Sequence, residues 1–304
     1  MDIIKIFILV MGSFLFFAVI GIMSGWLDRK ITARIQWRVG PPWWQNFADF
    51  IKLTGKEMVI PSTANQFLFL FSPVCGIISL TVIGAVLLSG VFFNPFRWGM
   101  DLIIIIYLLM IPSIAIVGAG ASSGNVLASV GTGRELRLFL SYELPFILAL
   151  LVPVIRFRTG QVSDIVLFQQ VYRMNIGYIS GFIAFIVGLL AFMGKLGYVP
   201  FDVSEAETEL AGGTFIEYSG LPLALFNLMK WLLLSVGISF LVIYFLSGFS
   251  NPVTGVLKYI CVLVLIILIK NTNPRLRTDQ ILKFFWGWLT ILGMFAILLC
   301  LLGL

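Results

Sequence analysis

The stretch Gly197-Tyr-Val-Pro-Phe-Asp-Val-Ser-Glu-Ala-Glu-Thr-Glu-Leu-Ala-Gly-Gly-Thr-Phe-Ile-Glu-Tyr-Ser-Gly220 separates two long apolar runs, about residues 178–195 and 224–247. It concentrates acidic residues in a chain that is 60% hydrophobic. Five of the chain's 14 acids fall within 16 positions of it, namely Asp202, Glu205, Glu207, Glu209 and Glu217. A charged loop between two apolar runs of spanning length is typical of a polytopic α-helical membrane protein.

The rest of the chain repeats this alternation. Charged residues make up 11% of it, against about 25% in an ordinary soluble domain, and the mean hydropathy is +1.06. We expect an all-α polytopic membrane protein with about eight transmembrane helices and a cytoplasmic amphipathic helix after the first span. Apolar sequence follows Met1-Asp2 directly, so we expect a retained first span and not a signal peptide. The expected spans are roughly 3–26, 66–90, 102–121, 137–155, 178–195, 224–247, 252–270 and 284–303.

The basic residues indicate the orientation. The odd-numbered loops hold 13 of the 20 Lys and Arg residues. The positive-inside rule therefore places these loops in the cytoplasm and both termini outside. We expect residues 1–304 to form a single integral membrane domain of the cell membrane, with cytoplasmic loops at about 27–65, 122–136, 196–223 and 271–283.

The first of these loops contains an amphipathic pattern. Its core, residues 41–56, begins with two prolines and places four apolar side chains at helical spacing, Trp43, Phe47, Phe50 and Ile51. The pattern predicts a helix in the lipid interface with its aromatic side chains at headgroup depth. A surface helix packed on a soluble partner is the alternative.

Several kinds of site are excluded by residue type. Histidine, the commonest metal ligand and general base, is absent. Cys75, Cys261 and Cys300 are dispersed in apolar runs, so we expect no metal and no cofactor in this chain. Residues 131–133, Gly-Thr-Gly, lack the Lys-Ser/Thr that follows in a phosphate-binding loop, and small residues here predict close backbone contact instead. In a membrane protein the net charge of +6 is informative about orientation rather than about nucleic acid, and no nucleic-acid partner is expected.

Glu143 is the most unusual acid outside the acidic stretch. It follows Arg137 by about 9 Å of helix in the expected fourth span, next to Pro145. An ionised carboxylate at that depth is unfavourable unless it is paired, hydrated or protonated. Glu143 is therefore either part of a proton pathway or a carboxylate satisfied by a neighbouring Arg, Lys or Tyr.

The acids of the stretch also allow two interpretations. Asp202-Val-Ser-Glu205 matches a helix-capping pattern, which leaves Glu207 and Glu209 unexplained. Glu205 and Glu209 are spaced to share a helix face, where like charges repel and favour proton uptake. A solvated acidic loop facing a basic partner is the alternative. Lys230, just inside the sixth span, is a candidate counter-charge.

Three segments together resemble the subunit 1/H family of respiratory complex I, which includes the membrane-anchor subunits of energy-converting hydrogenases and formate hydrogenlyase. They occur in the family's order on the matching loops, and the eight spans cover nearly the whole chain. The segments are Arg38-Val-Gly-Pro-Pro42 with Ala48-Asp-Phe-Ile-Lys-Leu53 and Lys56-Glu57, Ser141-Tyr-Glu-Leu-Pro145, and Val199-Pro-Phe-Asp-Val-Ser-Glu-Ala-Glu-Thr-Glu-Leu210 with Glu217-Tyr-Ser-Gly220.

The resemblance implies a membrane subunit of a redox-driven ion-pumping complex that itself binds no cofactor. Its implied partners are hydrophilic hydrogenase-like and iron–sulfur subunits on the cytoplasmic face, which carry iron–sulfur clusters and in some members a [NiFe] centre, together with antiporter-like membrane subunits and the lipid bilayer. The implied proton or ion pathway contains Glu143, Asp202, Glu205, Glu207, Glu209, Glu217 and Lys230. The expected docking residues for the peripheral arm are Arg29, Arg34, Arg38, Asp49, Lys52, Lys56, Arg134, Lys195 and Arg275.

Two departures favour the membrane-bound hydrogenase or sulfur-reducing branch. Quinone-dependent members usually have Glu-x-Asn-Arg-x-Pro-Phe-Asp, where this chain has Phe192-Met-Gly-Lys-Leu-Gly-Tyr-Val-Pro-Phe-Asp202, and the first loop has Gly-Pro-Pro-Trp-Trp in place of Gly-Pro-Asn. The alternative functions are a quinone-chamber subunit of an NADH:quinone oxidoreductase and a stand-alone secondary transporter. No internal repeat of the kind found in transporters is evident.

Overall fold

The computed structural model describes residues 3–92, 101–205, 207–249 and 251–304, and these are predominantly helical. Eight helical segments in this part of the chain are long and apolar enough to cross a membrane, as predicted. They are α1 (Ile3–Ile35), α3 (Gln66–Phe92), α4 (Leu102–Ser122), α5 (Val126–Phe157), α7 (Ile179–Leu196), α9 (Gly220–Phe245), α10 (Pro252–Thr272) and the combined segment Thr278–Leu301, made of α11 (Thr278–Leu282), the π-helix η3 (Lys283–Leu289) and α12 (Thr290–Leu301).

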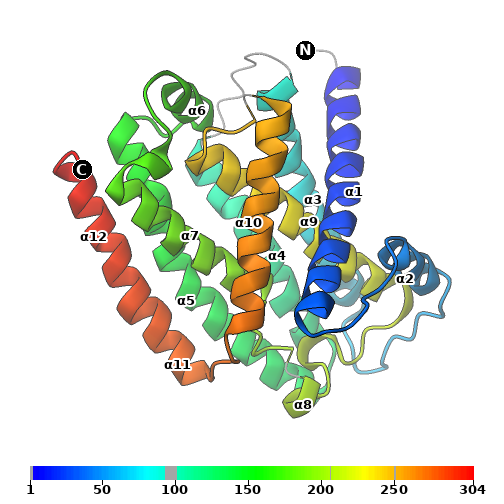
Figure 1. Ribbon diagram of the computed structural model, residues 1–304. Helices are drawn as coiled ribbons and strands as arrows, with labels where there is room; N and C mark the ends of the chain where they lie inside the picture. The colour runs from blue at the N-terminus through cyan, green and yellow to red at the C-terminus, as the bar shows by residue number, and fades with distance from the viewer. Residues whose placement is uncertain (1–2, 93–100, 206, 250) are drawn as a thin grey trace.

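Helix α9 forms the centre of the bundle. In its apolar window 89% of the residues are buried, against 28% for α1 and 33% for α10. It contacts α1, α3, α7 and α10, and it runs behind α10 in Figure 1. Because α9 has protein on nearly every side, a charged residue on it is surrounded by other side chains and not by lipid.

The two ends of the bundle differ. The start of α1, the end of α12 and the short helix α6 (Val162–Val171) lie at one end, whereas α2 (Gln45–Thr54), α8 (Glu207–Leu210) and α11 lie at the other, here called the loop end (Figure 1). The start of α1 and the end of α12 lie at the same end of the bundle, as expected for an even number of spans. All four segments that the sequence analysis assigns to the cytoplasm meet at the loop end.

Two of the helices are much longer than predicted. Helix α1 continues to Ile35, not to residue 26, and α5 begins at Val126, not at residue 137. The expected loops 27–65 and 122–136 are therefore partly helical. In α5 the extension is stabilised by packing, since Gly131 lies against the backbone of Ser204 and Thr214. The predicted close approach of small residues is confirmed there, whereas α6 and the 3-10 helix η1 (Asn175–Gly177) are not predicted by the sequence pattern.

The amphipathic helix of the first loop is present as α2. Asn46 fixes it to the bundle, because its side chain donates to the carbonyl of Ile22 at 3.0 Å and accepts from Arg29 at 2.8 Å. Phe50 packs against the core, while Trp43 and Trp44 remain more than half exposed. The helix thus has one face on α1 and α9 and one face free, which is compatible with either a lipid or a protein contact.

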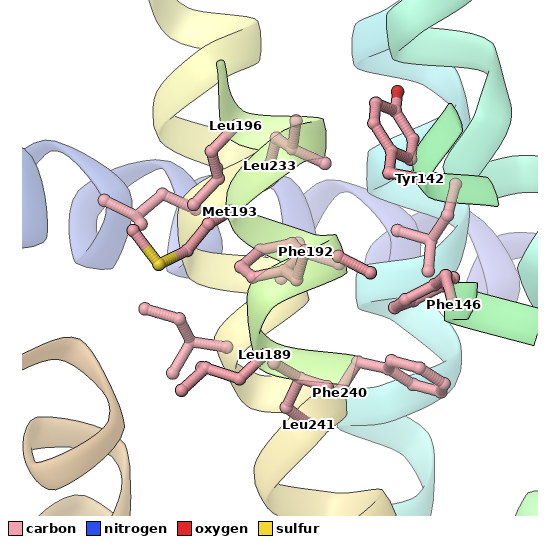
Figure 2. Packing of buried hydrophobic residues seen from close by; sticks show 14 of the residues in the cluster. Tyr142, Phe146, Leu189, Phe192, Met193, Leu196, Leu233, Phe240 and Leu241 are labelled. Atoms are coloured by element: carbon pink, nitrogen blue, oxygen red, sulfur yellow. The ribbon is translucent and has the colours of Figure 1, made fainter. Parts of the chain in front are cut away.

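Close packing between α5, α7 and α9 builds the core around the site. Figure 2 shows aromatic and aliphatic side chains of these three helices interleaved, with Tyr142 and Phe146 on one side of Phe192 and Met193 and Leu196 on the other. At Gly237 a Cβ would meet the Phe192 ring at 2.1 Å, so glycine is needed for α9 to approach α7 this closely.

Candidate functional site

The acidic stretch does not begin with a capped helix, so the capping interpretation of Asp202 and Glu205 is wrong. Residues 201–205 are irregular, and α8 starts only at Glu207 and has 4 residues. Asp202 instead forms an ion pair with Arg275, and both Glu205 oxygens accept from Lys230 at 2.5 and 2.6 Å. Lys230 is thereby confirmed as a counter-charge of the acidic stretch. Which acid it pairs with depends on contacts between segments that are distant in sequence, and no local pattern shows this.

These pairs border a polar pocket at the loop end. The pocket has a volume of about 430 Å³ and is lined by Leu196, Gly197, Tyr198, Val199, Asp202, Glu205, Lys230, Lys270 and Arg275. A further pair forms one of its edges, since Lys270 donates to the buried Asp28 at 2.7 Å and lies 4.5 Å from the centre of the Tyr198 ring. Burial raises the pKa of Tyr198 well above its usual value, so its hydroxyl stays protonated. The pocket therefore brings two acidic side chains, Asp202 and Glu205, together with the basic side chains of Lys230, Lys270 and Arg275.

A second ion pair lies deeper, between α5 and α7. The ammonium group of Lys195 donates to Oε2 of Glu143 at 2.6 Å, and the side chains are 0% and 8% exposed. The Tyr142 and Phe146 rings lie about 5 Å from the Lys195 nitrogen, at 5.1 and 4.9 Å. The other oxygen of Glu143 is buried and has no hydrogen-bond partner among the described residues. This pair, surrounded by aromatic rings, is well shielded from solvent.

The position of Lys195 differs from the one expected for a docking residue. It lies in the last turn of α7, at the end of the expected fifth span, and only 2% of it is exposed. A buried ammonium group cannot touch a peripheral partner directly. Lys195 is therefore the partner of Glu143. Of the two interpretations of Glu143, the structure matches the one in which a neighbouring cation pairs with the carboxylate. Pairing does not exclude proton transfer, because one carboxylate oxygen stays free.

Glu135, on α5, is a site residue that the sequence analysis misses. It is 3% exposed and hydrogen-bonded with Ser204, within electrostatic range of Asp202, Glu205 and Lys230. The sequence pattern places residues 122–136 in a loop, where a glutamate is unremarkable. The available signal is its position eight residues before Glu143, which becomes informative once both are known to share one helix.

The remaining acids lie apart from the pocket. Glu209 is exposed and accepts from Arg134 at 2.6 Å, and this contact lowers the pKa of Glu209 below its usual value. Glu217 accepts from Asn125 at 2.5 Å, and Asn125 caps the N-terminus of α5 by accepting from Leu127. The side chain of Glu207 lies outside the described residues.

The other expected docking residues gather at the loop end. Arg29 and Asp49 pair at 3.1 Å between α1 and α2. Next to them Arg34, Arg38, Lys52 and Lys56 are exposed, together with Trp37, which is 99% exposed. Within the described ranges, no group of three Cys, Asp or Glu side chains could hold a metal ion.

Comparison with known proteins agrees with this architecture. The family described as NADH dehydrogenase matches residues 5–301. The chain belongs to the NADH dehydrogenase family. It is 34% identical to NADH-quinone oxidoreductase subunit 8 of Thermus thermophilus, over 86% of this chain and 77% of that protein. It is 32% identical to the corresponding NADH-quinone oxidoreductase subunit of Syntrophotalea carbinolica, over 95% of this chain and 92% of that protein.

A solved structure extends the comparison to a second respiratory complex. The fold matches a chain in the structure of the membrane-bound sulfane sulfur reductase, an archaeal respiratory membrane complex, with a TM-score of 0.86 and 26% identity, over 97% of this chain and 99% of that one. The resemblance to the complex I subunit 1/H family is thereby confirmed. This member of the NADH dehydrogenase family is a membrane subunit of a complex I-like respiratory complex, and a stand-alone transporter is not supported.

Proposed function

We propose that this chain couples redox chemistry in a peripheral arm to ion translocation across the membrane. In this account the loop end faces the cytoplasm of the cell membrane, and both termini face outward. The peripheral arm consists of hydrophilic hydrogenase-like and iron–sulfur subunits, which hold the redox centres. Antiporter-like membrane subunits complete the pathway for H⁺ or Na⁺, and this chain itself carries charge by protonation of its carboxyl groups.

The observation that carries this proposal is the buried ion pair between Lys195 and Glu143. Removing two charges from water costs several kcal/mol per ion, and their mutual attraction repays this only with good geometry. Such a pair is a weak source of stability, but it responds strongly to any charge nearby. When Glu143 gains a proton, the positive charge of Lys195 is no longer balanced, and when Glu143 loses the proton the charge is balanced again. The site therefore has two electrostatic states.

The pocket at the loop end connects this pair with the proposed docking surface. Leu196 and Gly197, which line the pocket, directly follow Lys195 at the end of α7. Arg275 and Asp202 tie the irregular start of the acidic stretch to the loop before α11. A partner that moves either segment changes the distance between the pocket charges. The basic and aromatic residues around α2 form the proposed docking surface for that partner.

A second candidate function is suggested by the relatives, which are named as subunits of NADH-quinone oxidoreductase. It would make this chain a wall of a quinone chamber. Five of the nine residues that line the pocket of this chain are charged, namely Asp202, Glu205, Lys230, Lys270 and Arg275. Binding sites for apolar ligands are lined mostly by hydrophobic side chains. The charged lining therefore favours the hydrogenase or sulfur-reducing type.

The test begins with the tagged chain purified from its own membranes under mild detergent. We expect iron-containing subunits and antiporter-like subunits to co-purify. The complex is then supplied with electrons from reduced methyl viologen, and H₂, sulfide from polysulfide, and quinol are measured separately. Formation of H₂ or sulfide supports the proposal, whereas quinol alone supports the second candidate. A chain that purifies without redox subunits contradicts both.

A further inference from the structure

Glu135 is a buried acid without an ion pair of its own among the described residues. It lies on α5 with 3% exposure, hydrogen-bonded with Ser204 of the acidic stretch. The other buried acids at the site each have a cation within 4 Å, Glu143 through Lys195 and Asp28 through Lys270. A glutamate kept only for stability is expected to be paired in the same way, because an isolated buried charge is very unfavourable.

The positive charge that acts on Glu135, Lys230, is paired with another acid. Its ammonium group contacts both oxygens of Glu205, and it also acts on Glu135. Asp202, the other acid near Glu135, is held by Arg275. One lysine therefore serves two carboxyl groups, of which Glu205 lines the pocket and Glu135 lies inside the bundle.

Glu135 also lies on the way to Glu143. The two residues are eight positions apart on α5, or about 12 Å along its axis. Tyr142 is seven positions from Glu135 and so shares its helix face, and side chains on a helix lean toward its N-terminus, here toward Glu135. The Tyr142 hydroxyl is 2.6 Å from the Ser113 hydroxyl and within electrostatic range of both glutamates.

We propose that Glu135 is a proton carrier between the pocket acid Glu205 and the buried pair of Glu143 and Lys195. This rests on the proposed function. In the first step Glu205, protonated from the pocket, passes its proton to the Glu135 carboxylate, directly or through one water. The Lys230 ammonium keeps its own protons and stabilises whichever of the two carboxylates is ionised. In the second step the proton moves past the Tyr142 and Ser113 hydroxyls to the free oxygen of Glu143.

The test compares Glu135→Gln with two matched variants in the whole complex in sealed vesicles. Glutamine keeps the size and hydrogen-bonding of the side chain but carries no exchangeable acid proton. Glu143→Gln reports on the proposed function itself, and Glu57→Gln removes an exposed acid of the first loop. The readout is the ion gradient formed per electron transferred from reduced methyl viologen.

We expect Glu135→Gln to lower this ratio at least about tenfold, in line with the loss of a proton-transfer group, while electron transfer continues and Glu57→Gln stays at the wild-type ratio. A wild-type ratio for Glu135→Gln together with a loss for Glu143→Gln overturns the role of Glu135 and leaves the proposed function standing. Wild-type ratios for both overturn the proposed function as well.

Assembly and proton uptake provide independent checks. If Glu135→Gln does not assemble, Glu135→Asp takes its place, because it keeps the acid but lengthens each transfer. We expect an intermediate ratio, and a wild-type ratio contradicts the proposal. Infrared difference spectra between oxidised and reduced complex should contain a protonated carboxyl band that disappears in Glu135→Gln and persists in Glu57→Gln. A spectrum unchanged by Glu135→Gln also contradicts the proposal.

Discussion

The ammonium nitrogen of Lys195 lies 2.6 Å from Oε2 of Glu143 inside the bundle, with both side chains almost completely buried. The two residues come from different spans, α7 and α5, and lie 52 positions apart in the chain. Each is the other's only ion-pair partner among the described residues. Replacing one of them therefore leaves an uncompensated charge in a site lined by aromatic rings.

The first prediction concerns the stability of this pair. Lys195→Met should destabilise the chain by about 3–5 kcal/mol, because it leaves the Glu143 carboxylate buried without a partner. The double variant Lys195→Met with Glu143→Gln should recover most of that loss, since it removes both charges. The measurement is the denaturation midpoint of the detergent-solubilised complex. Equal midpoints for wild type and the single variant would show that the pair is not coupled as the structure indicates.

The second prediction concerns the turn after α8. Gly213 has φ +56°, and a Cβ there would lie 1.8 Å from the carbonyl oxygen of Ser204. Gly213→Ala should therefore destabilise the acidic stretch by about 1–3 kcal/mol. Gly133→Ala is the matched control, because Gly133 is exposed in α5 and no atom lies within 4 Å of its added Cβ. The control should be neutral or slightly stabilising, and a similar loss in both variants would refute the assignment.

The third prediction concerns pH. The Arg134 contact holds the pKa of Glu209 below the usual value for glutamate. The contact should therefore remain at neutral pH and be lost only as the pH falls through that lowered pKa. The check is a pH titration of the Glu209 carboxylate band, obtained as wild type minus Glu209→Gln. Its midpoint should lie below the ordinary value of about 4.3 and return to it in Arg134→Gln, whereas an unchanged midpoint in that variant would argue against the pairing.

The fourth prediction concerns the connection between the acidic stretch and the loop before α11. Arg275 binds Asp202, and the amide of Leu276 donates to the carbonyl of Pro200 at 3.0 Å. Asp202→Asn should weaken both contacts and speed hydrogen exchange at Leu276. The exposed Glu57→Gln provides a control of the same chemistry, for which no change is expected. Exchange at Leu276 that is equally slow in all three proteins would indicate that the ion pair does not hold this loop.

The sequence predicts the number and type of the spans because long apolar runs depend only on local composition. It also predicts which loops carry unusual residues, and the small residues near Gly131 do allow close backbone contact. Helix ends are harder to predict, because α5 extends into a polar region that packing keeps helical. The surface assignment of Lys195 is wrong for a related reason, since a lysine at the end of a span resembles a loop residue until its partner Glu143 is located.

Sequence reasoning predicts Lys230 as a counter-charge of the acidic stretch, but it does not predict which acid pairs with which cation. Local spacing treats Asp202, Glu205 and Glu209 as neighbours along one helix, where they would repel each other. Each instead has a separate cation, from the loop before α11, from α9 and from α5 respectively. These partners are determined by how the helices pack. The burial of Glu135 and its contact with Ser204 are not predicted for the same reason.

The measurement that tests the central claim most directly is the ion gradient formed per electron by the Glu143→Gln complex in sealed vesicles. The variant keeps the size of the side chain and its contact distance to Lys195, but it removes the exchangeable proton and the negative charge. The account predicts an assembled complex that still transfers electrons from reduced methyl viologen and forms little or no gradient, while the exposed Glu57→Gln forms a normal one. A Glu143→Gln complex that forms the wild-type gradient per electron would contradict the account.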